Sequence, residues 1–87
     1  MKKYVKTYLD HFNYGEQDFI RCERCGGKAV DIHHIKLLSA GGTDEITNLI
    51  GLCRRHHDQA HASILTEERL LNIIKKRNYG SSNYEGI

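Results

Sequence analysis

Four metal-binding side chains in two close pairs constrain this 87-residue chain more than any other feature of its sequence. Cys22 and Cys25 form the first pair, Cys53 and His56 form the second, and each pair has the same two-residue spacer. Two such pairs separated by a hairpin-sized gap are typical of a tetrahedral zinc site, because each turn supplies two ligands. The pattern predicts a small domain folded around a structural Zn²⁺ ion.

The size of the chain explains why it would need such an ion. A protein of 10.0 kDa with 39% hydrophobic residues has room for one domain with a thin core, and such domains usually depend on disulfides, a metal or a partner. The three cysteines would leave one unpaired in a disulfide framework, and no secretory signal is visible, so we expect a reducing cytoplasm. No apolar run approaches the length of a membrane span, which argues against a membrane protein.

The histidines that remain after zinc binding predict a second metal site. His57 and His61 are four residues apart in a segment, 54–63, that is expected to be helical, so they share a face that His56 does not share. If His57 bound zinc in place of His56, His56 would have no second histidine on its face of the helix, because its neighbour one turn later is Ala60. We therefore prefer His56 for zinc and keep His57 with His61.

His33 is expected on a strand that packs against this helix, so His33, His57 and His61 would form a three-ligand site with open positions. Open coordination is typical of catalytic metals. The adjacent His34 has an imidazole that can take a proton from water. Successive strand residues face opposite sides, so both histidines reach one site only if the strand bends or ends there, and the Asn48 amide is placed to hold such a bend.

The periodicity of the chain predicts an α+β domain. One strand is expected over 28–35, a loop over 36–47, a second strand over 48–53, and a short strand before the first cysteines at Phe19–Arg21. Thr66 is expected to cap a last helix whose first turn is acidic. The predicted organisation is a single domain over 1–87, with an N-terminal helix in 1–18, a zinc knuckle and core over 19–63, a helix over 64–77 and a flexible tail over 78–87.

Several of these motifs together resemble the HNH endonuclease family. They are Asp31-Ile32-His33-His34-Ile35, Gly41-Gly42-Thr43, Asn48-Leu49-Ile50-Gly51-Leu52-Cys53, and His56-His57 with His61. The resemblance covers residues 20–62 and implies a ββα-metal (His-Me finger) core, in which two antiparallel strands and a helix hold one divalent ion. The chain is most similar to the short, stand-alone HNH proteins of phage and prophage, which implies a bacterial host cell.

The resemblance also implies an activity and residue roles. The chain would hydrolyse DNA phosphodiesters to 5′-phosphate and 3′-hydroxyl ends. His34 would be the general base, Asn48 would orient it through its backbone, and His57 would bind the metal. The three-histidine set resembles the colicin nuclease branch of the family. The catalytic ion would be Mg²⁺, Mn²⁺, Ni²⁺, Co²⁺ or Zn²⁺, in addition to the structural Zn²⁺.

Charge identifies the expected partners. The net charge of +2 permits a nucleic-acid partner, and basic residues gather in three clusters, the last of which is Lys75-Lys76-Arg77. Arg54 and Arg55 would anchor phosphates of double-stranded DNA. Phage terminase or other packaging proteins are further candidate partners, and we expect no membrane partner and a monomer or weak dimer. The alternative is a non-catalytic zinc-stabilised DNA-binding or phage packaging accessory module, which would not need the second set of histidines.

Overall fold

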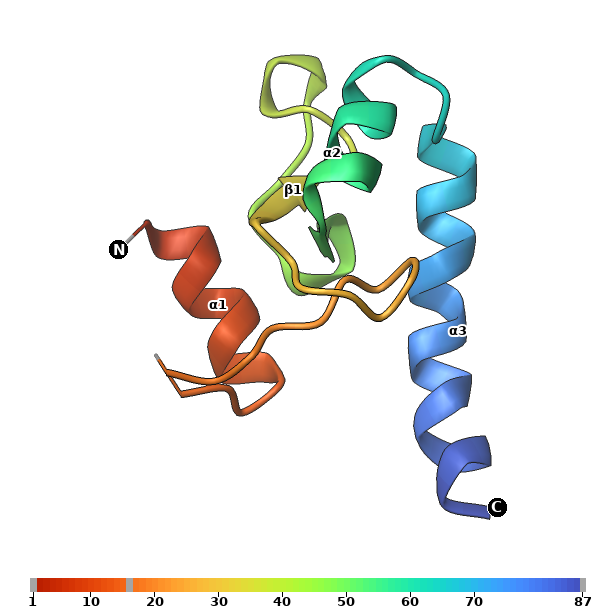
Figure 1. Cartoon of the computed structure of the whole chain (residues 1–87). Coiled ribbons are helices and arrows are strands. Elements are labelled where there is room, and N and C mark those ends of the chain that lie inside the picture. Colours follow the sequence, from red (N-terminus) through yellow and green to blue (C-terminus); the bar gives the residue numbers. More distant parts are fainter. Residues whose placement is uncertain (1, 16, 87) are drawn as a thin grey trace.

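The computed structural model describes residues 2–15 and 17–86, with side chains as far as residue 77. A β-hairpin followed by a short helix lies between two outer helices, so the fold is α+β with a ββα unit at its centre (Figure 1). Within the described residues, no helix combines the length and the hydropathy needed to cross a bilayer. The elements are α1 (Lys3–His11), β1 (Asp31–His34), η1 (Leu38–Ala40), η2 (Ile46–Asn48), β2 (Leu49–Leu52), α2 (Arg54–His61) and α3 (Glu67–Gly86).

Two short antiparallel strands form the hairpin. Asp31 pairs with Leu52 at one end of the ladder and His34 pairs with Leu49 at the other. Both strands are shorter than predicted from 28–35 and 48–53. The strand predicted at Phe19–Arg21 is absent from the described residues and is replaced by one bridge, between Arg21 and Lys28.

The chain turns back directly after that bridge, which leaves no length for a strand. The Cys22 N–H donates to the Gly27 carbonyl, and the Gly26 N–H donates to the Cys22 carbonyl. Gly26 has a φ of +82°, a left-handed conformation that glycine adopts at little cost. We call this turn, residues 22–27, the knuckle.

Two apolar clusters hold the outer helices against the hairpin. Ile32 and Leu49 pack with Tyr8 of α1. Ile50 and Leu52 pack instead with Leu65 and with residues of α3. Figure 1 accordingly shows α1 and α3 on opposite sides of the ββα unit. The nearly continuous apolar sequence of β2 thus reflects burial on both faces, since all of its residues are buried.

The last helix begins after the predicted Thr66 cap but ends later than predicted. Its backbone starts at Glu67, after Thr66, whose hydroxyl accepts from the Arg69 N–H at 3.3 Å, as expected of an N-cap. It continues to Gly86, so the prediction of a helix ending at 77 was wrong. A single internal glycine, here Gly80, weakens a helix by only about 1 kcal/mol, and the chain has no proline to stop it.

One ion pair connects α3 to the knuckle and to α1. Arg77 donates from Nε and Nη2 to the two carboxylate oxygens of Glu23, at 2.9 Å each. The Tyr8 hydroxyl donates to the same carboxylate at 2.5 Å. Burial, with the negative charge of Glu23 second, raises the pKa of Tyr8 well above its ordinary value, so Tyr8 stays a donor.

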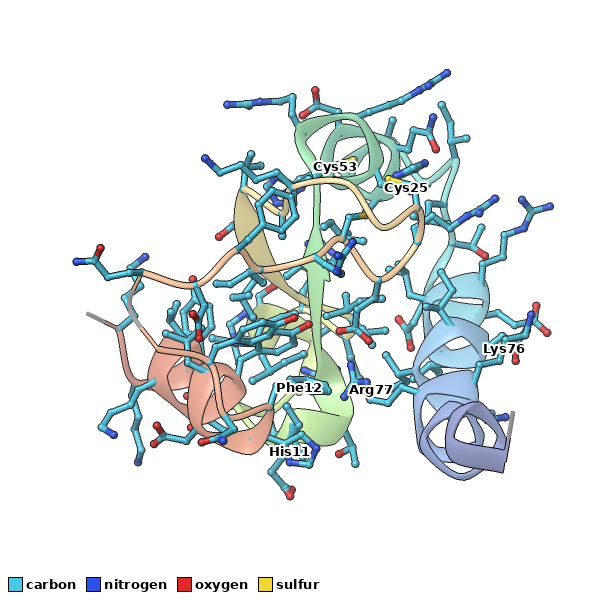
Figure 2. The ribbon with its side chains drawn as sticks, turned by 60° about the horizontal axis from the view of Figure 1, so that its bottom comes forward. His11, Phe12, Cys25, Cys53, Lys76 and Arg77 are labelled. Atoms are coloured by element: carbon cyan, nitrogen blue, oxygen red, sulfur yellow. The ribbon has the colours of Figure 1, made fainter. Side chains whose placement is uncertain are left out.

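Arg77 belongs to the last basic cluster of the sequence, but the structure removes most of its side chain from solvent. Its side chain is 12% exposed, and Figure 2 shows it reaching from α3 toward Phe12, whose ring centre lies 5.1 Å from the guanidinium carbon. It also donates to the carbonyls of Ile46 and Leu49, at 3.2 and 2.7 Å. We call the group Tyr8, Glu23 and Arg77 the inter-helix network.

Candidate active site

The two close pairs of the knuckle and of α2 converge on one point. Cys22, Cys25, Cys53 and His56 each place one ligand atom within 4.8 Å of the others, and we call them the Cys₃His cluster. The Cys25 and Cys53 sulfurs lie 3.8 Å apart, and the two are neighbours in Figure 2. His56 Nδ1 lies 3.2 Å from the Cys53 sulfur and 3.6 Å from that of Cys22.

The separations of 3.8 and 3.6 Å match those of a tetrahedral zinc site, whereas the 3.2 Å between His56 Nδ1 and the Cys53 sulfur is a few tenths of an ångström shorter. Bond lengths of about 2.3 Å to sulfur and about 2.0–2.1 Å to nitrogen imply ligands about 3.5–3.8 Å apart at tetrahedral angles. Burial lowers the pKa of His56, helped by the positive charges of Arg24 and Arg55. The backbone N–H of His56 is the main cause that lowers the pKa of the Cys53 thiol. A neutral imidazole and a more acidic thiol are what zinc ligation requires, so the cluster could hold a structural metal.

A second cluster lies on the other side of α2, at its junction with β1. His33, His57 and His61 place one nitrogen each within 4.8 Å of one another, and we call them the His₃ cluster. Nε2 of His57 and Nε2 of His61 lie 3.1 Å apart. That separation is slightly shorter than the about 3.3–3.4 Å that bonds of about 2.0–2.1 Å at tetrahedral angles imply for two nitrogen ligands of one zinc ion.

The chemistry of the His₃ cluster also suits a metal. His33 is 7% exposed, and burial, followed by the neighbouring His57 and His61, lowers its pKa to about 4. Its lone pair is therefore available at neutral pH. Asp31 places a carboxylate oxygen 3.1 Å from His57 Nε2.

A cavity of about 200 Å³ opens beside the cluster, where α2 meets the start of α3. His33 and His61 line it together with mainly apolar side chains and with Glu67. Two members of the His₃ cluster, His33 and His61, therefore border space that a further ligand can occupy. Such open coordination is the feature that distinguishes catalytic metal sites from structural ones.

His34 lies at the end of β1 and is not a member of the His₃ cluster. Its Nε2 lies 2.8 Å from a carboxylate oxygen of Asp44, and its ring centre lies 4.4 Å from that of Tyr4 in α1. The strand ends at this residue, which is one of the two conditions under which both histidines could serve one site.

Asn48 holds the backbone just after His34. Its Oδ1 accepts from the Lys36 N–H at 2.8 Å, and its Nδ2 donates to the Lys36 carbonyl at 3.0 Å. The same Nδ2 donates to the Thr43 carbonyl at 2.8 Å. The amide therefore clamps the end of β1 to the loop that precedes η2.

Arg54 and Arg55 occupy the first turn of α2 and are exposed. No described side chain forms a salt bridge with either of them. They follow directly after Cys53 and lie on the helix that carries ligands of both clusters, so they are free to contact an anionic partner.

Two neighbours of His34 were missed by sequence reasoning. Asp44 lies in the segment 36–47, which was predicted only as a loop, and Tyr4 lies in the predicted N-terminal helix. Asp44 contacts His34 across 10 positions of the chain, and Tyr4 contacts it across a segment that includes the whole knuckle. Contacts between positions so far apart leave no signal in a single sequence.

Comparison with known proteins gives one match. Residues 22–63, which include every member of both clusters as well as His34 and Asn48, match the model of the HNH endonuclease family. No curated protein and no solved structure matches the chain.

Proposed function

Because this chain belongs to the HNH endonuclease family, whose members are nucleases, we propose that it is a metal-dependent DNA endonuclease that hydrolyses phosphodiester bonds to 5′-phosphate and 3′-hydroxyl ends. The observation that supports the proposal is the His₃ cluster, in which three imidazole nitrogens lie within 4.8 Å of one another and two of the rings, those of His33 and His61, line a cavity. A purely structural domain has no use for this second cluster.

In this proposal His33, His57 and His61 hold one divalent ion. When bound, the ion would stabilise the negative charge that develops on the phosphate and on the leaving oxygen. Imidazole ligands favour Mn²⁺, Co²⁺, Ni²⁺ or Zn²⁺, whereas Mg²⁺ prefers oxygen. A carboxylate oxygen of Asp31 lies 3.1 Å from His57 Nε2, the nitrogen that would bind the ion, and would add negative charge beside it.

His34 is the proposed general base. A water oxygen attacks the phosphorus, its proton passes to the imidazole of His34, and the bond from phosphorus to the 3′ oxygen breaks. The leaving oxygen then takes a proton from solvent. Asn48 supports the step indirectly, because its three hydrogen bonds fix the backbone that follows His34.

Arg54 and Arg55 are the proposed DNA contacts. Both are exposed at the start of the helix that carries His57 and His61. Their guanidinium groups suit bidentate contact with phosphate. Binding through such contacts would weaken steeply as salt concentration rises.

The Cys₃His cluster is proposed to hold a structural Zn²⁺ ion. Four protein ligands leave no position for water, so this ion would contribute folding energy and no catalysis. Phage origin, a cytoplasmic location, packaging proteins as partners, a single-domain organisation and a monomeric or weakly dimeric state remain predictions.

Nicking of supercoiled plasmid DNA tests the proposal. The zinc-loaded protein, supplied in turn with each of the divalent ions named above, should convert supercoiled plasmid to open circles. His34→Ala should reduce the rate by about 10²–10⁴, the contribution of a general base, without loss of fold.

His11→Ala is the matched control, because it removes an exposed histidine of α1 and should nick at the wild-type rate. Equal rates for His34→Ala and wild type would refute the role of His34. A wild-type protein that binds DNA but never nicks it would favour the non-catalytic DNA-binding module.

A further inference from the structure

We propose that Asp44 is a positioning residue for the general base, which keeps the proton of the neutral His34 ring on Nε2 and leaves the lone pair of Nδ1 for water. The inference rests on the proposed function, in which His34 removes a proton from water. It adds a residue of the loop before η2 to the active site and specifies which nitrogen does the chemistry.

The contact between the two side chains determines the tautomer. Nε2 of His34 and Oδ1 of Asp44 lie 2.8 Å apart, the length of a charge-assisted hydrogen bond. An ionised carboxylate can only accept, so the nitrogen that faces it must carry the proton. A neutral imidazole has a single N–H, and therefore Nδ1 is unprotonated. No described residue hydrogen-bonds to Nδ1.

A second contact restricts the rotation of the ring. The Tyr4 ring of α1 lies against His34 at 4.4 Å between centroids, with the planes tilted by 55°. The His34 side chain is only 13% exposed, whereas Asp44 is 45% exposed. The imidazole is thus held between an aromatic ring and a carboxylate, with one nitrogen engaged by Asp44.

The loop that carries Asp44 is built to hold this distance. Asn48 Nδ2 donates both to the carbonyl of Thr43, which precedes Asp44, and to the carbonyl of Lys36, two residues after His34. One amide therefore joins the two backbone segments that bear the base and its partner. We infer that Asn48 sets the separation of His34 and Asp44 as well as the end of β1.

A glycine makes this close approach possible. A Cβ atom at Gly42 would lie 1.9 Å from the Lys36 carbonyl oxygen, which is backbone and cannot swing aside. Any other residue would push the loop, and Asp44 with it, away from β1. The Gly41-Gly42 pair that marked a turn in the sequence is therefore also a spacing element for the base.

Steady-state nicking by the full-length, zinc-loaded protein tests the role of Asp44. Asp44→Ala should lower kcat about 10- to 100-fold, part of the about 10²–10⁴ that a general base contributes, and leave KM nearly unchanged. Asp44→Glu keeps a carboxylate and should recover part of the rate. Glu45→Ala, which removes the same charge from the next residue, should behave as wild type. Circular dichroism and zinc content establish that each variant is folded.

The tautomer of His34 provides a second measurement, and it would not change if Asp44 had only a structural role. In nitrogen NMR of the histidine rings, the signals of His34 are those that disappear in His34→Ala. In the wild type they should show a protonated Nε2 and an unprotonated Nδ1. Asp44→Ala should show a mixture of tautomers. Protonated Nδ1 in the wild type, or the same spectrum in both proteins, would overturn the inference.

The kinetic outcomes separate this inference from the proposed function. A wild-type protein without nicking activity would refute the proposed function and, with it, any catalytic role of Asp44. A wild-type protein that nicks DNA while Asp44→Ala nicks equally fast would refute the inference alone.

Discussion

Replacement of Arg77 by methionine should destabilise the protein severely, although Arg77 lies 14 positions beyond the segment that matches the HNH family model. The guanidinium makes two hydrogen bonds to Glu23 and two to backbone carbonyls. Arg77→Met keeps much of the aliphatic stem but leaves the Glu23 carboxylate, only 13% exposed, without its cation.

The expected magnitude follows from this burial. Removing one partner of a buried ion pair destabilises a protein by about 3–5 kcal/mol, because the remaining charge is uncompensated. At about 0.05–0.15 kcal/mol per residue, a domain of this length has a free energy of unfolding of roughly 4–13 kcal/mol. Arg77→Met should therefore remove a quarter or more of the stability, and at the lower end of that range the variant would be largely unfolded.

Urea unfolding of the zinc-loaded protein, followed by far-UV circular dichroism, measures this change. Lys76→Met is the matched control, because Lys76 is exposed on the same helix and should change the free energy of unfolding by less than about 0.5 kcal/mol. The double variant Glu23→Gln with Arg77→Met removes both charges and should be more stable than Arg77→Met alone. An Arg77→Met protein within about 1 kcal/mol of the wild type would refute the reasoning, since that is the value of one ordinary hydrogen bond.

Two further predictions concern the metal clusters. His56→Cys should keep one tightly bound zinc per chain, because thiolate also suits a tetrahedral site, whereas His56→Ala should lose zinc and unfold. Elemental analysis measures the zinc content and circular dichroism measures the fold. Equal zinc content in the two variants would show that His56 is not a zinc ligand. The second prediction follows from the pKa of His33, which is lowered from 6.5 to about 4 in the folded protein. Because the unfolded chain takes up that proton first, the stability is fully present above pH 6.5 and declines as pH falls toward 4. His33→Leu should show a shallower decline in urea unfolding, and parallel curves would contradict the assignment.

Most of the fold class and of the two clusters could be predicted from the short-range spacing of residues in the sequence. The two-residue spacers of the cysteine and histidine pairs and the four-residue step from His57 to His61 are properties of a single turn or helix, so the sequence was enough to predict them. The hairpin, α2 and the Thr66 cap could be read in the same way, to within a few residues at each end.

The partners of His34 and of Glu23 came only from the packed structure. Asp44 reaches His34 because a glycine lets the loop touch the strand, and Tyr4 reaches it because α1 packs on that face of the hairpin. Arg77 looked like one more surface cation, yet it pairs with Glu23 across 54 positions of the chain. Residue type and short-range periodicity describe what one turn or strand can do, whereas contacts between distant segments depend on how those segments are packed together.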